Sequence, residues 1–116
     1  MAEFREVSKI DELKDGRMKT VTVAGREILL ARVGAKYFAA ESRCTHMGAS
    51  LSQGKLEGTV VTCSRHGSQF DLSNGQVVRW LKGSGLTSTL GKIFKPPKSL
   101  TTYNVKVEQD RVLVEI

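Results

Sequence analysis

All the cysteine and histidine of this chain lies in two short segments, and this distribution constrains the fold more than any other feature. The segment "CTHMGASL" contains Cys44 and His46, and the segment "CSRHGSQF" contains Cys63 and His66. Two thiolates and two imidazoles make a complete set of four metal ligands. A fold that brings these four donors to one metal centre must place the two segments side by side.

Three kinds of metal site compete for this ligand set. A structural zinc site fits the ligand count, but zinc fingers usually keep the cysteines on one arm and the histidines on the other. A blue copper site needs only one cysteine, together with a weak axial methionine. A [2Fe–2S] cluster suits the mixed order, because each arm can give its cysteine to one iron and its histidine to the other. Without a metal, a cysteine and a histidine can also be ordinary core residues. This explanation is plausible for one such segment, but much less so for two.

Composition predicts one globular domain without export or membrane signals. The chain has 116 residues, of which 40% are hydrophobic and 26% are charged, as in an ordinary soluble protein with a modest core. The first ten residues, "MAEFREVSKI", contain acids and no apolar stretch typical of a signal peptide. No apolar run is long enough to span a bilayer. We therefore expect a cytoplasmic protein, in which a disulfide between the two cysteines is disfavoured.

The charge is positive and unevenly distributed. The formal net charge is +6 and the pI is about 9.6. Between Leu72 and Val107 there is no acidic residue, and the basic residues there are Arg79, Lys82, Lys92, Lys95, Lys98 and Lys106. This segment is either a solvated basic loop or a docking surface for an acidic partner. Nucleic-acid binding is not expected, because the basic residues are not densely clustered and only 6% of residues are aromatic.

The hydrophobic pattern is mostly of period two, which predicts an all-β fold, a small antiparallel sandwich or barrel. The expected strands lie within residues 19–25, 26–33, 36–41, 58–63, 69–80 and 103–116. Asn74-Gly75 predicts a hairpin within the fifth of these runs. In the last run we expect a turn at Gln109-Asp110, with four valines facing the core. These valines are Val105, Val107, Val112 and Val114.

Two segments fall outside this pattern. Residues 8–16, "SKIDELKDG", predict about one helical turn that Gly16 ends. Residues 81–99 contain three glycines and Pro96-Pro97 without a clean period, so we expect a long loop with a helical turn around Leu90–Phe94.

The two Cys/His boxes resemble those of Rieske [2Fe–2S] proteins, C-x-H and C-x-x-H, which are separated here by sixteen residues. The whole chain is similar to the soluble Rieske ferredoxins. The similarity is strong from about residue 40 to 116, through "CTHMGASLSQG", "CSRHGSQFDLSNGQVV" and "LTTYNVKV", and is one of pattern only before that. It implies a single Rieske domain, residues 1–116. Its base would be 1–41 and 82–116, and its inserted cluster-binding subdomain would be about 42–81.

The resemblance also implies the ligands of the cluster. Cys44 and Cys63 would bind the inner iron, and His46 and His66 would bind the outer iron, each leaving one ring nitrogen at the surface. The pKa of that exposed nitrogen would depend on the oxidation state, so the reduction potential would fall with pH once the histidines ionise.

Residues next to the ligands have implied roles as well. Gly48 and Gly67 would let the loops turn tightly and bring backbone amides near the sulfides. Ser68 would donate a hydrogen bond to a bridging sulfide. Pro96-Pro97 resembles a third loop that covers the cluster, and Trp80 and Phe70 would shield it or simply belong to the core.

Histidine ligation favours reduction. Two thiolates make the oxidised site neutral, whereas four would leave it doubly negative, and the potential rises to about −150 to +300 mV. High-potential relatives carry a tyrosine where this chain has Phe70, and a disulfide where it has Ala49 and Arg65. We therefore expect a potential in the lower part of this window, raised somewhat by Ser68.

The resemblance implies a one-electron carrier without a substrate of its own, which shuttles between a flavoprotein reductase and a terminal oxygenase such as a ring-hydroxylating dioxygenase. Its positive segment would dock on acidic partners. Two alternatives stay open at this point. One is a Rieske-like small subunit of an assimilatory nitrite reductase, and the other is a structural zinc-binding module.

Overall fold

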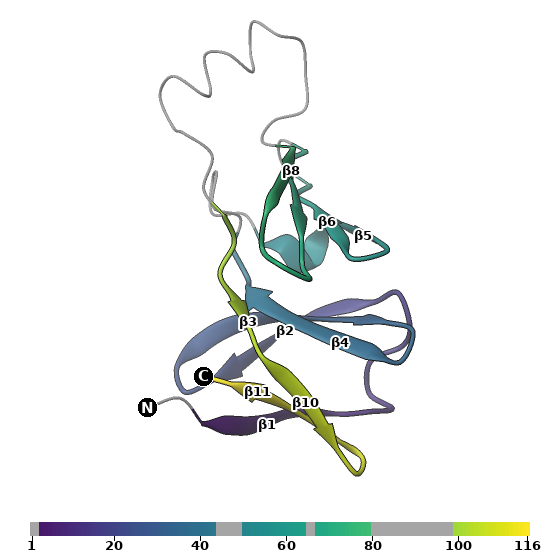
Figure 1. Ribbon diagram of the computed structural model, residues 1–116, viewed down its shortest axis with the longest axis vertical. Coiled ribbons are helices and arrows are strands. Elements are labelled where there is room, and N and C mark those ends of the chain that lie inside the picture. Colours follow the sequence, from purple (N-terminus) through teal and green to yellow (C-terminus); the bar gives the residue numbers. More distant parts are fainter. Residues whose placement is uncertain (1–2, 44–49, 65–66, 80–98) are drawn as a thin grey trace, which may run out of the picture.

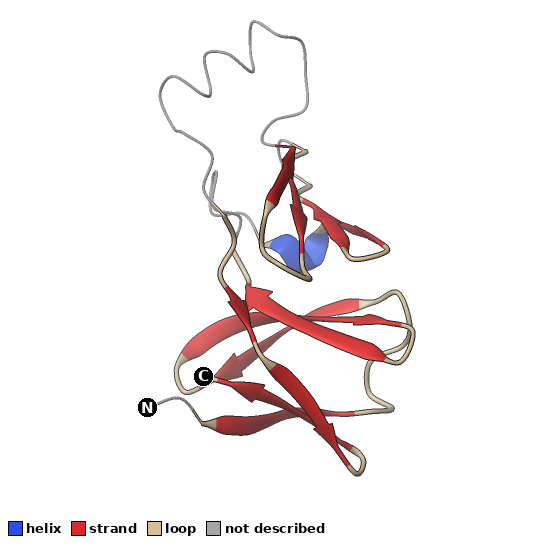
Figure 2. Ribbon diagram, in the orientation of Figure 1, coloured by secondary structure: helices blue, strands red, loops and turns tan. Residues whose placement is uncertain are grey.

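The computed structural model describes residues 3–43, 50–64, 67–79 and 99–116. In these ranges the chain forms eleven β-strands and one short 3₁₀ helix, so the expected all-β class is confirmed (Figures 1 and 2). The strands are β1 (Phe4–Lys9), β2 (Met18–Val23), β3 (Arg26–Val33), β4 (Lys36–Glu41), β5 (Lys55–Glu57), β6 (Val60–Thr62), β7 (Gln69–Asp71), β8 (Val77–Arg79), β9 (Thr102–Tyr103), β10 (Val105–Glu108) and β11 (Arg111–Glu115), and the helix is η1 (Leu51–Gln53).

The strands form three antiparallel sheets. One sheet has the order β1-β11-β10, the second has β2-β3-β4-β9, and the third has β5-β6-β7-β8. The first two sheets pack together as a sandwich, which we call the base. The third sheet and η1 lie at one end of the base, and both chain termini lie at the base itself (Figure 1).

Strand β3 holds the three sheets together because it is buried on both faces. Its residues Ile28, Leu29, Leu30 and Ala31 are all fully buried. Since successive side chains of a strand point to opposite faces, Ile28 and Leu30 face the first sheet while Leu29 and Ala31 face the third. The continuous apolar run in "EILLARV" is thus the sequence signature of a central layer.

Two hydrophobic cores result. The base core, between the first two sheets, consists of Leu13, Val23, Ile28, Leu30, Ala39, Val112 and Val114. The junction core, between the second and third sheets, consists of Leu29, Ala31, Ala40, Leu51, Val61, Cys63, Phe70, Leu72 and Leu100. The junction core packs the third sheet directly against the base.

The expectation of a helical turn within residues 8–16 is wrong. Ser8 and Lys9 instead belong to β1, which pairs with β11, and turns follow as far as Gly16. The backbone here bonds to neighbouring strands, because Ile10 N–H donates to the carbonyl of Asp110 at 2.9 Å and Gly16 N–H donates to that of Arg32 at 2.8 Å. The local backbone bonds, from Glu12 N–H to the carbonyl of Lys9 at 3.2 Å and from Arg17 N–H to that of Lys14 at 3.1 Å, form separate turns and no helix.

The closing hairpin was predicted correctly except at one valine. Its turn lies at Gln109-Asp110, where Gln109 has a φ of 57°. Val112 and Val114 are buried and Val105 packs against the base core. Val107, in contrast, is 46% exposed, because it lies near the turn, where the hairpin extends past the core.

The hairpin predicted at Asn74-Gly75 is present, but its connection is longer than two residues. It joins β7 to β8 through residues 72–76, and Gly75 has a φ of 77°. The N–H groups of Asn74 and Gly75 both donate to the carbonyl of Asp71, at 3.3 and 2.6 Å. The turn is therefore built around Asp71.

Candidate metal centre

The second ligand segment begins at the end of β6 and closes on itself. The N–H of Cys63 donates to the carbonyl of Ser68 at 2.7 Å, and the N–H of Gly67 donates to the carbonyl of Cys63 at 3.1 Å. Gly67 has a φ of 75°, a conformation that a residue with a side chain rarely adopts. These bonds fix both ends of the loop that contains His66, whose own placement lies outside the described residues.

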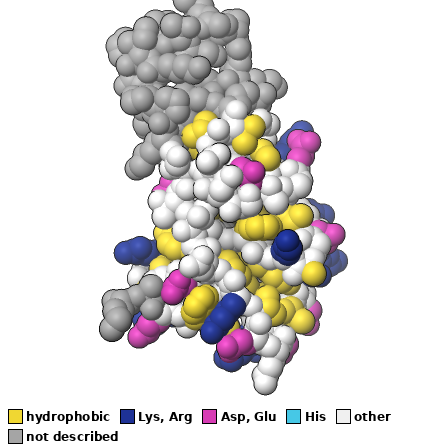
Figure 3. Space-filling view, in the orientation of Figure 1, with side chains coloured by type: hydrophobic (Ala, Val, Ile, Leu, Met, Phe, Trp, Pro, Cys, Tyr) yellow, Lys and Arg dark blue, Asp and Glu magenta, His cyan; other side chains and the backbone are white. Residues whose placement is uncertain are grey.

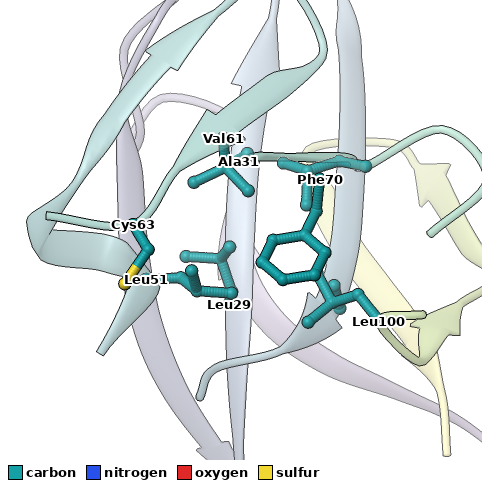
Figure 4. Packing of buried hydrophobic residues seen from close by; sticks show 9 residues of the cluster. Leu29, Ala31, Leu51, Val61, Cys63, Phe70 and Leu100 are labelled. Carbon is teal, nitrogen blue, oxygen red and sulfur yellow. The ribbon is translucent and has the colours of Figure 1, made fainter. Parts of the chain in front are cut away.

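The side chain of Cys63 lies in the junction core. It is 2% exposed and belongs to an apolar cluster, in which Leu51 lies beside it (Figure 4). A thiolate is costly in such surroundings unless a cation compensates its charge. The donor chemistry of Cys63 therefore fits a metal-bound sulfur on the inner side of a site.

The structure also shows how Ser68 and Phe70 are buried. Both side chains are fully buried, and Phe70 packs in the junction core. Phe70 has no hydroxyl group and cannot supply the hydrogen bond that a tyrosine would. Ser68 retains a hydroxyl group within five residues of Cys63, on the closed loop.

The first ligand segment is held at both of its ends. Arg43 and Ser50 form an isolated antiparallel bridge, and Leu51 N–H donates to the carbonyl of Ser42 at 2.8 Å. Leu51 then packs in the junction core together with Cys63. The two segments are thus joined at their bases, as a common metal centre requires.

A third segment ends at the same place. Leu100 N–H donates to the carbonyl of Gly75 at 2.8 Å, and Glu41 N–H donates to the carbonyl of Thr101 at 2.9 Å. Leu100 is buried in the junction core. The chain that follows the long 81–99 segment therefore returns between β4 and the β7–β8 turn, beside the ends of both ligand segments.

Two glycines make these close approaches possible, and sequence reasoning did not assign them this role. A Cβ atom on Gly75 would come within 2.1 Å of the carbonyl oxygen of Leu100. A Cβ atom on Gly54 would come within 1.9 Å of the carbonyl oxygen of Thr62. Both glycines stand in the quoted motifs, but only the folded chain shows which backbone they approach.

The remaining expected residues are not placed. The residues that lie outside the described ranges are Cys44, His46, Gly48, Ala49, Arg65, His66, Trp80, Leu90–Phe94 and Pro96-Pro97. Within the described ranges no group of three or more potential metal-ligating residues occurs. Cys63 is the one member of the expected ligand set that these ranges contain.

Asp71, at the turn that supports the loop, has a lowered pKa. The largest causes are hydrogen bonds from the Ser73 hydroxyl and the Ser73 backbone N–H, followed by one from Thr59; burial opposes them. The donor distances are 2.6 Å for the Ser73 hydroxyl and 2.9 Å for each of the other two. The ionised carboxylate thus holds the β7–β8 turn and the start of β6 together.

The match to a protein family identifies the chain as an iron–sulfur protein. The chain belongs to the family described as Rieske [2Fe-2S] domain, which matches residues 3–89. Its cofactor is accordingly a [2Fe–2S] cluster, and the zinc alternative does not agree with this family.

One relative by sequence and two solved structures are similar to this chain. It is 33% identical over 107 residues to a "Naphthalene 1,2-dioxygenase/salicylate 5-hydroxylase systems, ferredoxin component" of Ralstonia sp, covering 92% of this chain and 89% of that one. A ferredoxin of carbazole 1,9a-dioxygenase from Nocardioides aromaticivorans shares the fold, with a TM-score of 0.79, 23% identity, and coverage of 96% and 95%. A chain in a "complex of reduced oxygenase and oxidized ferredoxin in carbazole 1,9a-dioxygenase" has a TM-score of 0.76, 28% identity, and coverage of 96% and 91%.

The chain is therefore a one-electron carrier, and not an enzyme in its own right. Among the residues that the structure describes, no helix has the length and apolar character needed to cross a membrane.

Proposed function

We propose that Cys44, His46, Cys63 and His66 hold the cluster, with the cysteines on the inner iron and the histidines on the outer iron. The buried thiol of Cys63 supports the inner position of sulfur. The shared anchoring of the two ligand segments in the junction core supports a site built from both. The cluster, when bound, accepts and releases one electron at a site that two thiolates make neutral.

The protein's own residues prepare this site. Cys63 supplies a thiolate from a dry environment, in which the electrostatic effect of nearby dipoles is strong. Gly67 gives the loop its left-handed turn, and Gly48 has the corresponding position in the first segment. Ser68, fully buried at the end of the loop, supplies a hydroxyl donor toward a bridging sulfide.

The chain serves as the ferredoxin of an oxygenase system, taking electrons from a flavoprotein reductase and passing them to a terminal oxygenase. The observation that carries this proposal is the near full-length similarity to ferredoxin components, in which neither chain has a large unmatched part. The solved complex of a similar ferredoxin with its oxygenase supports a direct protein–protein transfer. We place the system in the cytoplasm, a reducing compartment in which the two cysteines stay available as thiolate ligands.

The partners dock on the positive stretch of the chain. Residues 42–106 contain nine basic and two acidic side chains, whereas residues 1–41 and 107–116 contain nine basic and ten acidic ones. On the face shown in Figure 3, acidic and basic side chains are interspersed over the base. The excess of positive charge therefore lies in the stretch of sequence that contains both ligand segments and the 81–99 segment, and an acidic partner surface complements it.

We assign the chain to a single domain, 1–116, whose base comprises 1–41 and 82–116 and whose cluster-binding subdomain comprises about 42–81. The separate third sheet supports this division, and the junction core supports its being one folding unit.

Reconstitution tests this function. The protein purified without air should be red-brown and should carry iron and acid-labile sulfide in equal amounts. Added to a matching reductase and oxygenase, it should make oxygenase turnover dependent on its concentration. Turnover that is unaffected by the protein would contradict the proposal, and stable copurification with a large reductase subunit would indicate the nitrite reductase alternative instead.

A further inference from the structure

Ser42 is a buried hydroxyl residue beside the first ligand segment that the chemistry described so far does not use. It follows β4 directly and precedes Cys44 by two residues. Its exposed fraction is 2%, which makes it one of three buried polar residues in the described part of the chain, with Ser8 and Ser68. Its backbone carbonyl is occupied by the N–H of Leu51, at 2.8 Å.

The hydroxyl group of Ser42 has no hydrogen-bond partner within the described ranges, whereas that of Ser8 donates to the carbonyl of Lys9 at 3.0 Å and accepts from Lys19 Nζ at 3.0 Å. A buried hydroxyl group without a hydrogen-bond partner destabilises the folded state, because it loses its bonds to water and gains none in return. Alanine would fill the same space without this cost. The position therefore retains a polar group that the described part of the fold does not satisfy.

The location of Ser42 indicates where its partner comes from. Arg43 and Ser50 pair at the base of the first ligand segment, and Thr101, after the third segment, bonds to the neighbouring Glu41. Ser42 thus lies where the ends of these two segments meet. Serine hydroxyls commonly bond to backbone groups about two residues further along the chain, which here is the position of Cys44.

We propose that in the cluster-loaded protein the Ser42 hydroxyl hydrogen-bonds to the ligand segment that begins at Cys44, and that it positions this cysteine for the cluster. Ser42 is thus a positioning residue that acts through Cys44. The proposal rests on the ligand set proposed above.

The test compares cluster-loaded Ser42→Ala with the wild-type protein. Loss of one hydrogen bond at the ligand segment should accelerate chelator-driven cluster loss by about 3- to 10-fold. It should also change the midpoint potential and the EPR line shape of the reduced cluster. Ser42→Thr, which keeps the hydroxyl group, should restore the wild-type rate and potential.

Ser8→Ala is the matched control. It removes a hydroxyl group that is equally buried but bonded within the base. It should lower the thermal midpoint while leaving the potential and the EPR spectrum unchanged.

Two results would overturn the proposal. One is a Ser42→Ala protein with unchanged cluster loss and unchanged potential, which would mean that the hydroxyl group remains unpaired. The other is a Ser42→Thr protein that behaves like Ser42→Ala, which would mean that shape and not hydrogen bonding matters. A wild-type protein without iron and sulfide would contradict the proposed ligand set itself, before any variant is made.

Discussion

At the scale of single residues, the neighbours of the ligands determine how the cluster behaves. Ser68 is fully buried and adjoins the loop that Cys63 begins, while the side chain of Phe70 offers no donor. The proposed site therefore has one hydroxyl donor, from Ser68, whereas a second donor at position 70 would raise the potential further.

We expect Ser68→Ala to lower the midpoint potential. A hydrogen bond to the reduced cluster of about 1 kcal/mol corresponds to about 40 mV for a one-electron couple. Redox titration followed by visible absorption measures the shift. Ser64→Ala, on the exposed side of the same loop, is the control and should leave the potential where it is. A potential that does not move in Ser68→Ala would exclude the serine as a donor.

We expect Asp71→Asn to lower the stability of the β7–β8 turn by about 1–2 kcal/mol at pH 7, because its hydroxyl and amide donors would lose a charged acceptor. The folded-state pKa of Asp71 is below its ordinary value, so this stabilisation is complete above the ordinary value. The stabilisation is lost as the pH falls through the lowered, folded-state pKa.

Thermal midpoints of the two proteins measured from pH 7 downward test this expectation. The difference between them should persist to about pH 5 and decrease only at lower pH. Asp11→Asn, an exposed aspartate in the turn after β1, should behave like the wild type. A difference that is absent at pH 7, or that grows as the pH falls, would contradict the assigned role of Asp71.

At the scale of elements, the fold brings the ends of three chain segments to one place. Gly75 is the point at which the third segment meets the β7–β8 turn, through the bond from Leu100 and the close approach of its carbonyl. The same glycine also has a φ of 77°.

We expect Gly75→Ala to destabilise the protein by more than its backbone conformation alone explains. Gly34→Ala is the matched control, because Gly34 also has a positive φ, of 63°, but has open space around its Cα. Gly34→Ala should lower the free energy of unfolding by about 1–2 kcal/mol. Gly75→Ala should cost clearly more and should accelerate cluster loss, because Leu100 must move. Equal thermal midpoints for the two variants would contradict a role for this close contact.

The sequence predicted strongly patterned elements well. The alternation in β2, the apolar run of β3 and the last hairpin identified most of the base. Strand β1 was missed because "FREVSK" mixes apolar and charged residues without alternation, and only its pairing with β11 defines it. Tertiary bonds also replaced the local helix expected after it.

The candidate site was predictable to a different degree. Spacing alone indicated the four ligands proposed above, because cysteine and histidine are rare in this chain and occur in pairs, and of these four the structure describes Cys63. Ser42 and Gly54 could not be found in this way, because their importance depends on burial and on the backbone that lies opposite. Sequence patterns carry neither kind of information.

At the scale of the whole molecule, the positive charge is concentrated in the stretch of sequence that also contains both ligand segments. Residues 42–106 carry a net charge of +7, and the rest of the chain carries −1. Such a distribution orients the molecule as it approaches an acidic partner, and it increases the rate of encounter more than the final affinity.

We expect the second-order rate of electron transfer to the oxygenase to fall as salt is added, since the Debye length shortens from about 10 Å at 0.1 M to about 3 Å at 1 M. Stopped-flow mixing of reduced protein with oxidised oxygenase measures this rate. Replacing Lys92 and Lys95 by glutamine should weaken the salt dependence, whereas the same change at Lys14 and Lys36 in the base should not. A rate independent of salt would leave the positive segment without a docking role.

Electron transfer by this protein is proposed to depend on imidazole and thiolate donors that share one diiron centre, so that an added electron enters a neutral site. Pulsed EPR of the reduced cluster tests this most directly, because it detects ligand nitrogen by its magnetic coupling. We expect strong coupling to two imidazole nitrogens, with one coupling lost in His46→Cys and one in His66→Cys. A reduced cluster without nitrogen coupling would contradict it.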